Sequence, residues 1–125
     1  MLFEADDLHE QLVEFAAGRG VRATFDRAVI VAAVSEAASL AGGRAVDEPA
    51  AIFLALARRS RALASVAADF IPALVYAYAI ALGFQIAAVE VELSVFRARI
   101  LLDGIEWHEL RTWFAARLRP VAPAG

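Results

Sequence analysis

The sequence predicts a single all-α domain, a compact bundle of about six helices around one buried central helix. Two observations predict this fold class. Apolar residues recur at helical spacing in successive segments, and glycines, prolines or acidic residues separate those segments at helix-like intervals. With 125 residues, the chain has the ordinary size of one domain. We expect residues 1–119 to form this helical domain and residues 120–125 to form a flexible Pro-rich tail.

Composition narrows the classes of partner. Hydrophobic residues make up 61% of the chain, against about 45 to 50% in an ordinary domain. This excess predicts an interface with a protein partner or with further copies of the chain. The net charge is -3 and every basic residue is arginine, which disfavours nucleic acid as a ligand. Cysteine is absent and the first residues are acidic, so we expect a cytoplasmic protein without an export signal.

The first two helices are predicted from their ends. An acidic pair, Asp6 and Asp7, begins the first helix, which stops near Gly18 and Gly20. Thr24 is the expected cap of the second helix, which the glycine pair at 42–43 ends. The apolar series of the first helix is Leu12, Val13, Phe15 and Ala16.

The third and fourth helices carry most of the predicted core. Residues 47–49, Asp-Glu-Pro, are a start signal, because proline fits the first turn of a helix. Either Ser65 or Asp69 can cap the fourth helix, and we favour Asp69. Pro72 then lies in the first turn and Gly83 at the end of the helix. Residues 70–82 are apolar all round, which predicts the enclosed central helix of the bundle. A short extended or looping link should follow over residues 84–86.

The same segment raises the possibility of a membrane span. Residues 71–89 contain no charge and are long enough to cross a bilayer. However, Pro72, Gly83 and Gln85 interrupt the stretch, and neither a basic cluster nor an aromatic belt flanks it. We therefore interpret it as a buried helix and expect no contact with a membrane.

Two further helices complete the prediction. Residues 91–102 are amphipathic and end at the turn formed by Asp103 and Gly104. The last helix covers residues 106–118 and has an aromatic side, which is the candidate interface and comprises Trp107, Trp113 and Phe114.

The histidines do not predict a metal site. Residues 108–112, His-Glu-Leu-Arg-Thr, begin like a zinc-binding helix motif, but Thr112 stands where the second histidine is needed. The other histidine, His9, lies among acidic residues, and we expect it on a solvated helix face. We predict no metal and no cofactor.

The strongest candidate site is a group of three arginines, Arg58, Arg59 and Arg61. They precede the start of the apolar fourth helix, where free backbone N–H groups and guanidinium groups can bind an anion together. Alternatively, they solvate the end of a helix or pair with Asp47, Glu48 or the acids of a partner.

No set of residues predicts catalysis. The acidic groups at Asp6, Asp7 and Glu10, and at Glu90 and Glu92, are those that capping and the helix dipole favour. No serine lies in a nucleophile elbow, and the glycines follow helices rather than precede them, which excludes a phosphate loop.

From Glu48 onwards, the order of features resembles a Doc toxin of the Fic (death-on-curing) family. A helix at residues 50–59 leads into the position of the family's catalytic loop. A buried apolar helix over residues 73–82 then closes in Gly83 and Phe84, and an amphipathic helix, a glycine turn and a final helix with Trp113 follow. The resemblance implies a six-helix fold and a groove in which an antitoxin segment binds.

The family's catalytic residues are missing. Counted back without gaps from Gly83, the catalytic histidine of the family falls on Arg61, its metal-binding acid on Ser65 and its phosphate cradle on residues 66–69. Without an imidazole, nothing takes a proton from an attacking hydroxyl, and Asp69 repels a phosphate. The resemblance therefore implies an inactive copy.

Three functions follow from these patterns. The first is a catalytically inactive, Doc-like domain related to toxin–antitoxin systems, which acts by binding a protein such as an antitoxin-like helix. The second is a structural helical homo-oligomer assembled through the tryptophans and the apolar faces. The third is an enzyme that binds an anion or phosphate compound through Arg58, Arg59 and Arg61.

Overall fold

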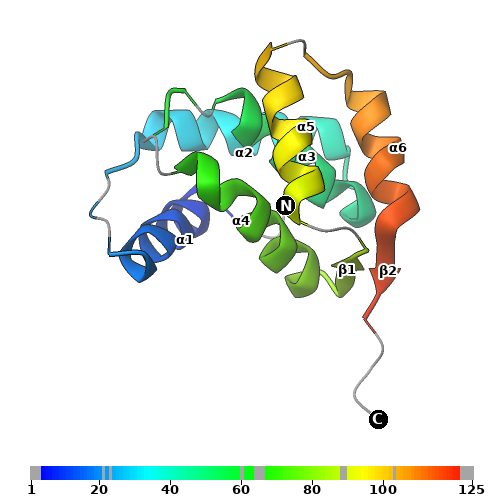
Figure 1. Ribbon diagram of the computed structural model, residues 1–125, viewed down its shortest axis with the longest axis horizontal. Helices are drawn as coiled ribbons and strands as arrows, with labels where there is room; N and C mark the ends of the chain where they lie inside the picture. Colours follow the sequence, from blue (N-terminus) through cyan, green and yellow to red (C-terminus); the bar gives the residue numbers. More distant parts are fainter. Residues whose placement is uncertain are drawn as a thin grey trace.

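The computed structural model describes residues 4–20, 22, 24–59, 61–63, 67–87, 90–102 and 104–121. Within these ranges the chain forms six α-helices, one short 3-10 helix and a small two-stranded sheet (Figure 1). In chain order the elements are α1 (Ala5–Gly18), α2 (Arg27–Ala41), η1 (Ala45–Asp47), α3 (Glu48–Arg58), α4 (Ala67–Ala81), β1 (Phe84–Ile86), α5 (Glu90–Leu102), α6 (Trp107–Arg117) and β2 (Leu118–Pro120). The prediction of a mostly helical domain with six helices is confirmed.

The central helix of the bundle is α3. All of its residues from 48 to 57 are buried, because α2, α4, α5 and α6 pack around it. In Figure 1, α3 lies behind α5 and between α2 and α6. Several of the buried positions are alanines, whose small side chains let neighbouring helices approach on every side; they are Ala50, Ala51, Ala55 and Ala57.

The prediction that residues 70–82 form the enclosed central helix is therefore wrong. α4 packs against its neighbours on one side only, through residues such as Leu74 and Tyr78, while Ala77, Ile80 and Ala81 are exposed. Both sides of this helix are apolar, so its composition does not reveal which side faces the core. No helix in the described parts of the chain is long and apolar enough to cross a membrane.

The observed starts of three helices differ from the predicted ones. Asp26 caps α2 by accepting a hydrogen bond from the Ala28 backbone N–H at 2.9 Å, so the cap is not Thr24. α4 begins at Ala67, which places Pro72 inside the helix rather than in its first turn. α1 begins at Ala5, one residue before the acidic pair, with a reciprocal capping box between Glu4 and Asp7.

The predicted stops agree better with the structure. Gly42 ends α2 in the left-handed conformation, with φ of +58°, and its N–H bonds to the Ala38 carbonyl. Gly83 follows α4 with φ of +92°. In α1, the core contacts come from Leu8, Leu12 and Ala16, whereas Val13 of the predicted series is exposed.

A short antiparallel sheet joins the end of α4 to the end of α6. Phe84 pairs with Pro120 and Ile86 with Leu118, so the predicted link over residues 84–86 is a strand. The Val121 N–H donates to the Gly83 carbonyl at 2.9 Å and extends this pairing. Pro120, which was expected in the flexible tail, therefore belongs to β2, and residues 122–125 lie outside the described chain.

Candidate functional site

The predicted arginine cluster is organised around a carboxylate that the sequence analysis did not identify. Glu36, on α2, accepts a hydrogen bond from Nη1 of Arg58 at 2.6 Å and another from Nη1 of Arg59 at 2.5 Å. The same Arg59 nitrogen also donates to the Ala55 carbonyl at 3.0 Å, which holds the guanidinium against α3. Glu36 thus ties the last turn of α3 to α2.

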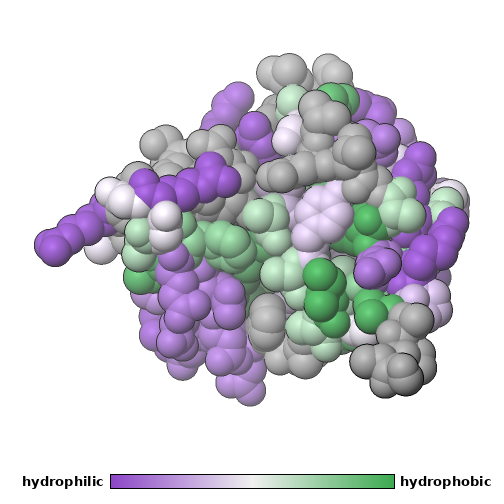
Figure 2. All heavy atoms as spheres, turned by 60° about the horizontal axis from the view of Figure 1, so that its bottom comes forward, coloured by the Kyte–Doolittle hydropathy of each residue, from purple (hydrophilic) through white to green (hydrophobic). Residues whose placement is uncertain are grey.

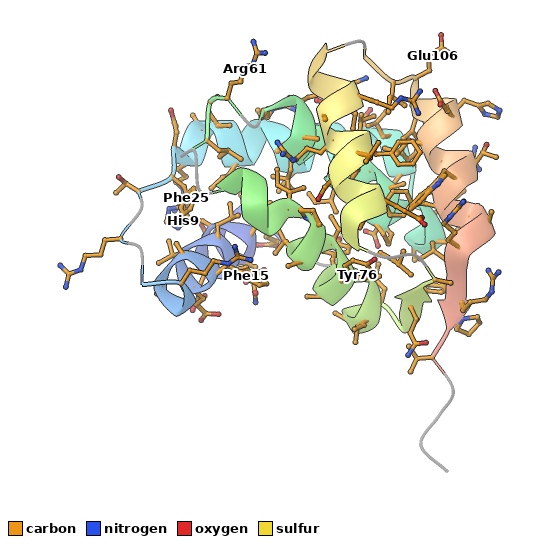
Figure 3. The ribbon with its side chains drawn as sticks, viewed as in Figure 1. His9, Phe15, Phe25, Arg61, Tyr76 and Glu106 are labelled. Carbon is orange, nitrogen blue, oxygen red and sulfur yellow. The ribbon has the colours of Figure 1, made fainter. Side chains whose placement is uncertain are left out.

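The electrostatics of this group favour an ionised Glu36. Partial burial by itself would raise the pKa of the Glu36 carboxyl, but the hydrogen bonds and charges of Arg59 and Arg58 outweigh it and lower the pKa below its usual range. Arg61, in contrast, is exposed and points away from the body of the molecule (Figure 3). The three predicted anion-binding arginines therefore do not converge on one point.

The sequence did contain a signal for Glu36. It is the only acidic residue between Asp26 and Asp47, and it lies on an otherwise apolar and small-residue helix. Asp47, one of the predicted partners, pairs with Arg44 and Arg111 instead. Glu36 is 22 residues from Arg58, so only the packing of α2 on α3 brings the two side chains together.

Asp47 belongs to a second charged group. Its carboxylate is almost fully buried, and its Oδ2 atom lies 2.5 Å from Nε of Arg44 and 3.1 Å from Nε of Arg111. Because Arg111 comes from α6, this group ties the 3-10 helix at the start of α3 to the last helix. Two cations around one buried carboxylate provide the pairing that burial of a charge requires.

The predicted aromatic interface is mostly part of the packing between helices. Phe114 is 1% exposed and lies against Phe53 of α3, with 5.7 Å between ring centroids. Trp113 meets Phe96 of α5 edge-on at 4.8 Å, and the Arg117 guanidinium lies 4.2 Å from the centre of the Trp113 ring. Phe114 therefore belongs to the packing between α3 and α6 rather than to the exposed surface of the chain.

The two tryptophans also contact the core. Trp107 and Trp113 are half-buried and pack against the buried residues. Arg117 and Phe96 also lie against the Trp113 ring, so little of this ring is open to a partner.

The histidines lie apart. His108 is exposed, and its backbone carbonyl accepts a hydrogen bond from Oγ1 of Thr112 at 2.9 Å. His9 is half-buried rather than solvated, because its ring meets the edge of Phe25 at 6.5 Å (Figure 3). Among the described residues, no group of three or more histidine or acidic side chains is placed to hold a metal ion.

The most distinctive surface is the exposed side of α4, which we call the α4 face and define as Ala77, Ile80 and Ala81. Ile80 is 59% exposed, the largest exposed fraction among the large hydrophobic side chains of the described chain. Ala77 and Ala81 are also exposed, and Tyr76 is half-buried. Figure 2 shows apolar side chains gathered across the middle of this side of the molecule, with hydrophilic side chains on both flanks.

A shallow hollow of about 440 Å³ lies on α1, the helix that flanks α4. Its lining residues are Gln11, Glu14, Phe15, Gly18 and Arg19. They include one carboxylate and one guanidinium but no nucleophile and no pair of acids, so this lining does not form a catalytic group.

Comparison of the chain with family models, with curated proteins and with solved structures finds no match.

Proposed function

We propose that this chain is a non-catalytic protein-binding domain that binds an apolar helix through the α4 face. The observation that supports this function is the exposure of apolar side chains along α4, which carries no charge from Ile71 to its end at Ala81. Burial of the exposed part of Ile80 alone stabilises a complex by on the order of 1 kcal/mol. A helix laid along the face buries several such groups at once.

The charged residues support a binding function over an enzyme. Arg58 and Arg59 are paired with Glu36, and the Asp47 carboxylate is paired with Arg44 and Arg111. These pairs hold helices together within the chain, which accounts for the arginines without a substrate. An anion-binding enzyme would need Arg58 and Arg59 to exchange this carboxylate for the ligand, at the cost of leaving Glu36 without its partners.

The resemblance to Doc toxins suggests a toxin–antitoxin context for this function. A Doc-like copy that lacks the catalytic histidine, the acid and the phosphate cradle acts through binding, with an amphipathic antitoxin-like helix as its partner. Arg61, at the histidine position, is exposed, while Ser65 and Val66 lie outside the described residues. α4, which the resemblance places at the centre, is the helix that carries the exposed apolar face.

Co-purification from the native host tests the function. The tagged chain is compared with Ile80→Glu, which puts a charge on the α4 face, and with Val31→Glu, which puts the same charge on an exposed position of α2. We expect the wild type and Val31→Glu to retain a stoichiometric partner, either the product of a neighbouring gene or a further copy. Ile80→Glu should lose it.

Two results would contradict the proposed function. One is retention of the same partner by Ile80→Glu at the wild-type level, which would place the interface elsewhere. The other is turnover of a phosphate compound that disappears in Arg61→Ala, which would support the anion-binding enzyme instead.

A further inference from the structure

We propose that the edge of β1 that faces away from β2 binds an extended segment of a partner protein, which adds a third strand to the sheet. This site is separate from the α4 face and goes beyond the proposed function. The backbone hydrogen bonds of the two strands, which leave one edge of the sheet open and close the other, support it.

The register of the sheet determines which backbone groups of β1 point away from β2. The Ala87 N–H donates to the Arg117 carbonyl at 2.7 Å, which makes these two residues a hydrogen-bonded pair. In an antiparallel sheet, hydrogen-bonded and non-hydrogen-bonded pairs alternate along the strands. Phe84 and Ile86 are therefore in non-hydrogen-bonded pairs, and their backbone N–H and carbonyl groups point away from β2. Within the described part of the chain, none of these four groups has a hydrogen-bond partner.

The outer edge of β2, in contrast, has its backbone groups occupied. The Leu118 N–H donates to the Phe114 carbonyl in the last turn of α6, and the Leu118 carbonyl accepts a hydrogen bond from Nη1 of Arg119 at 3.0 Å. Pro120 has no N–H group to donate. A further strand can therefore pair with β1 but not with β2.

β1 lacks the features that ordinarily keep an edge strand from pairing. Natural edge strands carry charged residues or proline, or are bent by a bulge. Residues 84–87, Phe-Gln-Ile-Ala, include neither a charge nor a proline, and the register of β1 with β2 is continuous. The strand reaches the surface, because Gln85 and Ala87 are exposed and Phe84 is half-buried. Only its length of three residues limits the number of hydrogen bonds that it can form.

The occupant that fits this edge is a short extended peptide segment. In an antiparallel arrangement, two of its residues lie opposite Phe84 and Ile86, and each exchanges two backbone hydrogen bonds with its neighbour. Because Ile86 is buried and Gln85 is exposed, the segment should place apolar side chains beside Phe84 and Ile86 and a polar one beside Gln85. Neither paired residue of the segment can be proline, which has no N–H.

A segment of a different protein fits this edge better than β1 of a second copy does. α4 ends at Ala81 and α5 begins at Glu90, so a helix lies close to either end of the three-residue strand. A second copy would bring its own α4 and α5 up against these helices. A single extended segment is narrow enough to lie along the strand alone.

Titration of the ¹⁵N-labelled chain with a synthetic peptide tests the open edge. The probe is acetyl-Lys-Val-Thr-Val-Thr-Val-Lys-amide, and the control peptide has proline at all five central positions, which keeps the charge but removes the backbone donors. Four hydrogen bonds of ordinary net strength correspond to a dissociation constant of about 1 mM. At about 10 mM probe, the amide hydrogens of Phe84 and Ile86 should therefore exchange with solvent about tenfold more slowly. The Ala87 amide, already bonded to Arg117, should change little, and the control peptide should have no effect.

Phe84 offers a matched pair of variants. Since it lies in a non-hydrogen-bonded pair, Phe84→Pro removes the outward N–H without removing a hydrogen bond between β1 and β2. Phe84→Leu changes the side chain and keeps the N–H. We expect Phe84→Pro to weaken binding of the probe about tenfold or more, and Phe84→Leu to leave it within about twofold. Protection of the Ala87 amide in each variant checks that the sheet is still formed.

Three results would overturn the proposal. The first is a chain that, without peptide, already protects the Phe84 and Ile86 amides as strongly as the Ala87 amide, because the edge is then closed. The second is an equal effect of the probe and the proline control, or no slowing of exchange by the probe at about 10 mM. The third is protection of both amides that increases with the concentration of the chain alone, which would assign the edge to a second copy.

Discussion

Glu36 is a surface carboxylate that joins two helices through two guanidinium groups. Its side chain is 22% exposed, and those of Arg59 and Arg58 are 24% and 44% exposed, so solvent weakens but does not abolish the pairs. Sequence reasoning identified the arginines but not their partner, because pairing over more than 20 residues depends on how α2 packs against α3. The charge of a residue can be read from the sequence, whereas its neighbour across the fold cannot.

Glu36→Gln should lower the free energy of unfolding by about 1 kcal/mol at neutral pH, because it removes two charge-assisted hydrogen bonds. The folded-state pKa of Glu36 is lowered, so the unfolded chain takes up this proton first as the pH falls. The stabilisation is therefore complete above the ordinary carboxyl pKa of about 4.3 and is lost as the pH falls through the lower folded-state value.

Urea unfolding of both proteins at about pH 7, 5 and 3 measures this difference. The wild type and Glu36→Gln should differ most at the two higher pH values, and the difference should shrink at the lowest. A gap that stays the same in acid would mean that Glu36 acts through packing rather than through its charge.

At the scale of the elements, helix ends were easier to predict than helix surroundings. A glycine that adopts positive φ, such as Gly42 or Gly83, leaves a local signature, and both lie just beyond a helix in the structure. The cap of α2 was misassigned because Thr24 and Asp26 are both good capping residues two positions apart. The choice depends on where the first turn begins, which is fixed by the contacts of α2 with α1 and α3.

Replacement of each capping candidate separates the two. Asp26→Ala should lower the free energy of unfolding by about 1 kcal/mol, since it removes the acceptor for the Ala28 backbone N–H. Thr24→Ala, on an exposed residue that precedes the cap, should change it by less than about 0.5 kcal/mol. Thermal and urea unfolding measure the stability of the two variants. An equal loss of stability in both would mean that neither residue alone is the cap.

At the scale of the whole molecule, the arrangement of the helices was the least predictable feature. The sequence predicts apolar helices for the segments that form α3 and α4. Of the two, the segment of α4 is the longer and more hydrophobic, and it was predicted to be the central helix. The structure encloses α3 instead and leaves one side of α4 exposed. The number of neighbours around a helix is a tertiary property, although the alanines of α3 do permit close packing on every side. The candidate site was missed for the same reason. The α4 face has the same apolar composition as the buried side of the helix, and only the packing of the other helices leaves it exposed.

Because α3 lies at the centre of the bundle and α4 at its surface, replacing a large side chain in each should change the free energy of unfolding by very different amounts. Phe53, in α3, is fully buried and contacts Phe114, so Phe53→Ala should lower the free energy of unfolding by about 3 to 5 kcal/mol through the cavity it leaves. Ile80, in α4, is mostly exposed, so Ile80→Ala should cost less than about 1 kcal/mol in the monomer.

Since the loss expected for Phe53→Ala approaches the entire stability of a small domain, Phe53→Leu provides a milder variant that still creates a cavity. Urea unfolding is measured at the lowest practical chain concentration, because any assembly that buries Ile80 would add its binding energy to the apparent stability. A large loss for Ile80→Ala under those conditions, with a small one for Phe53→Leu, would reverse the order and return α4 to the centre of the bundle.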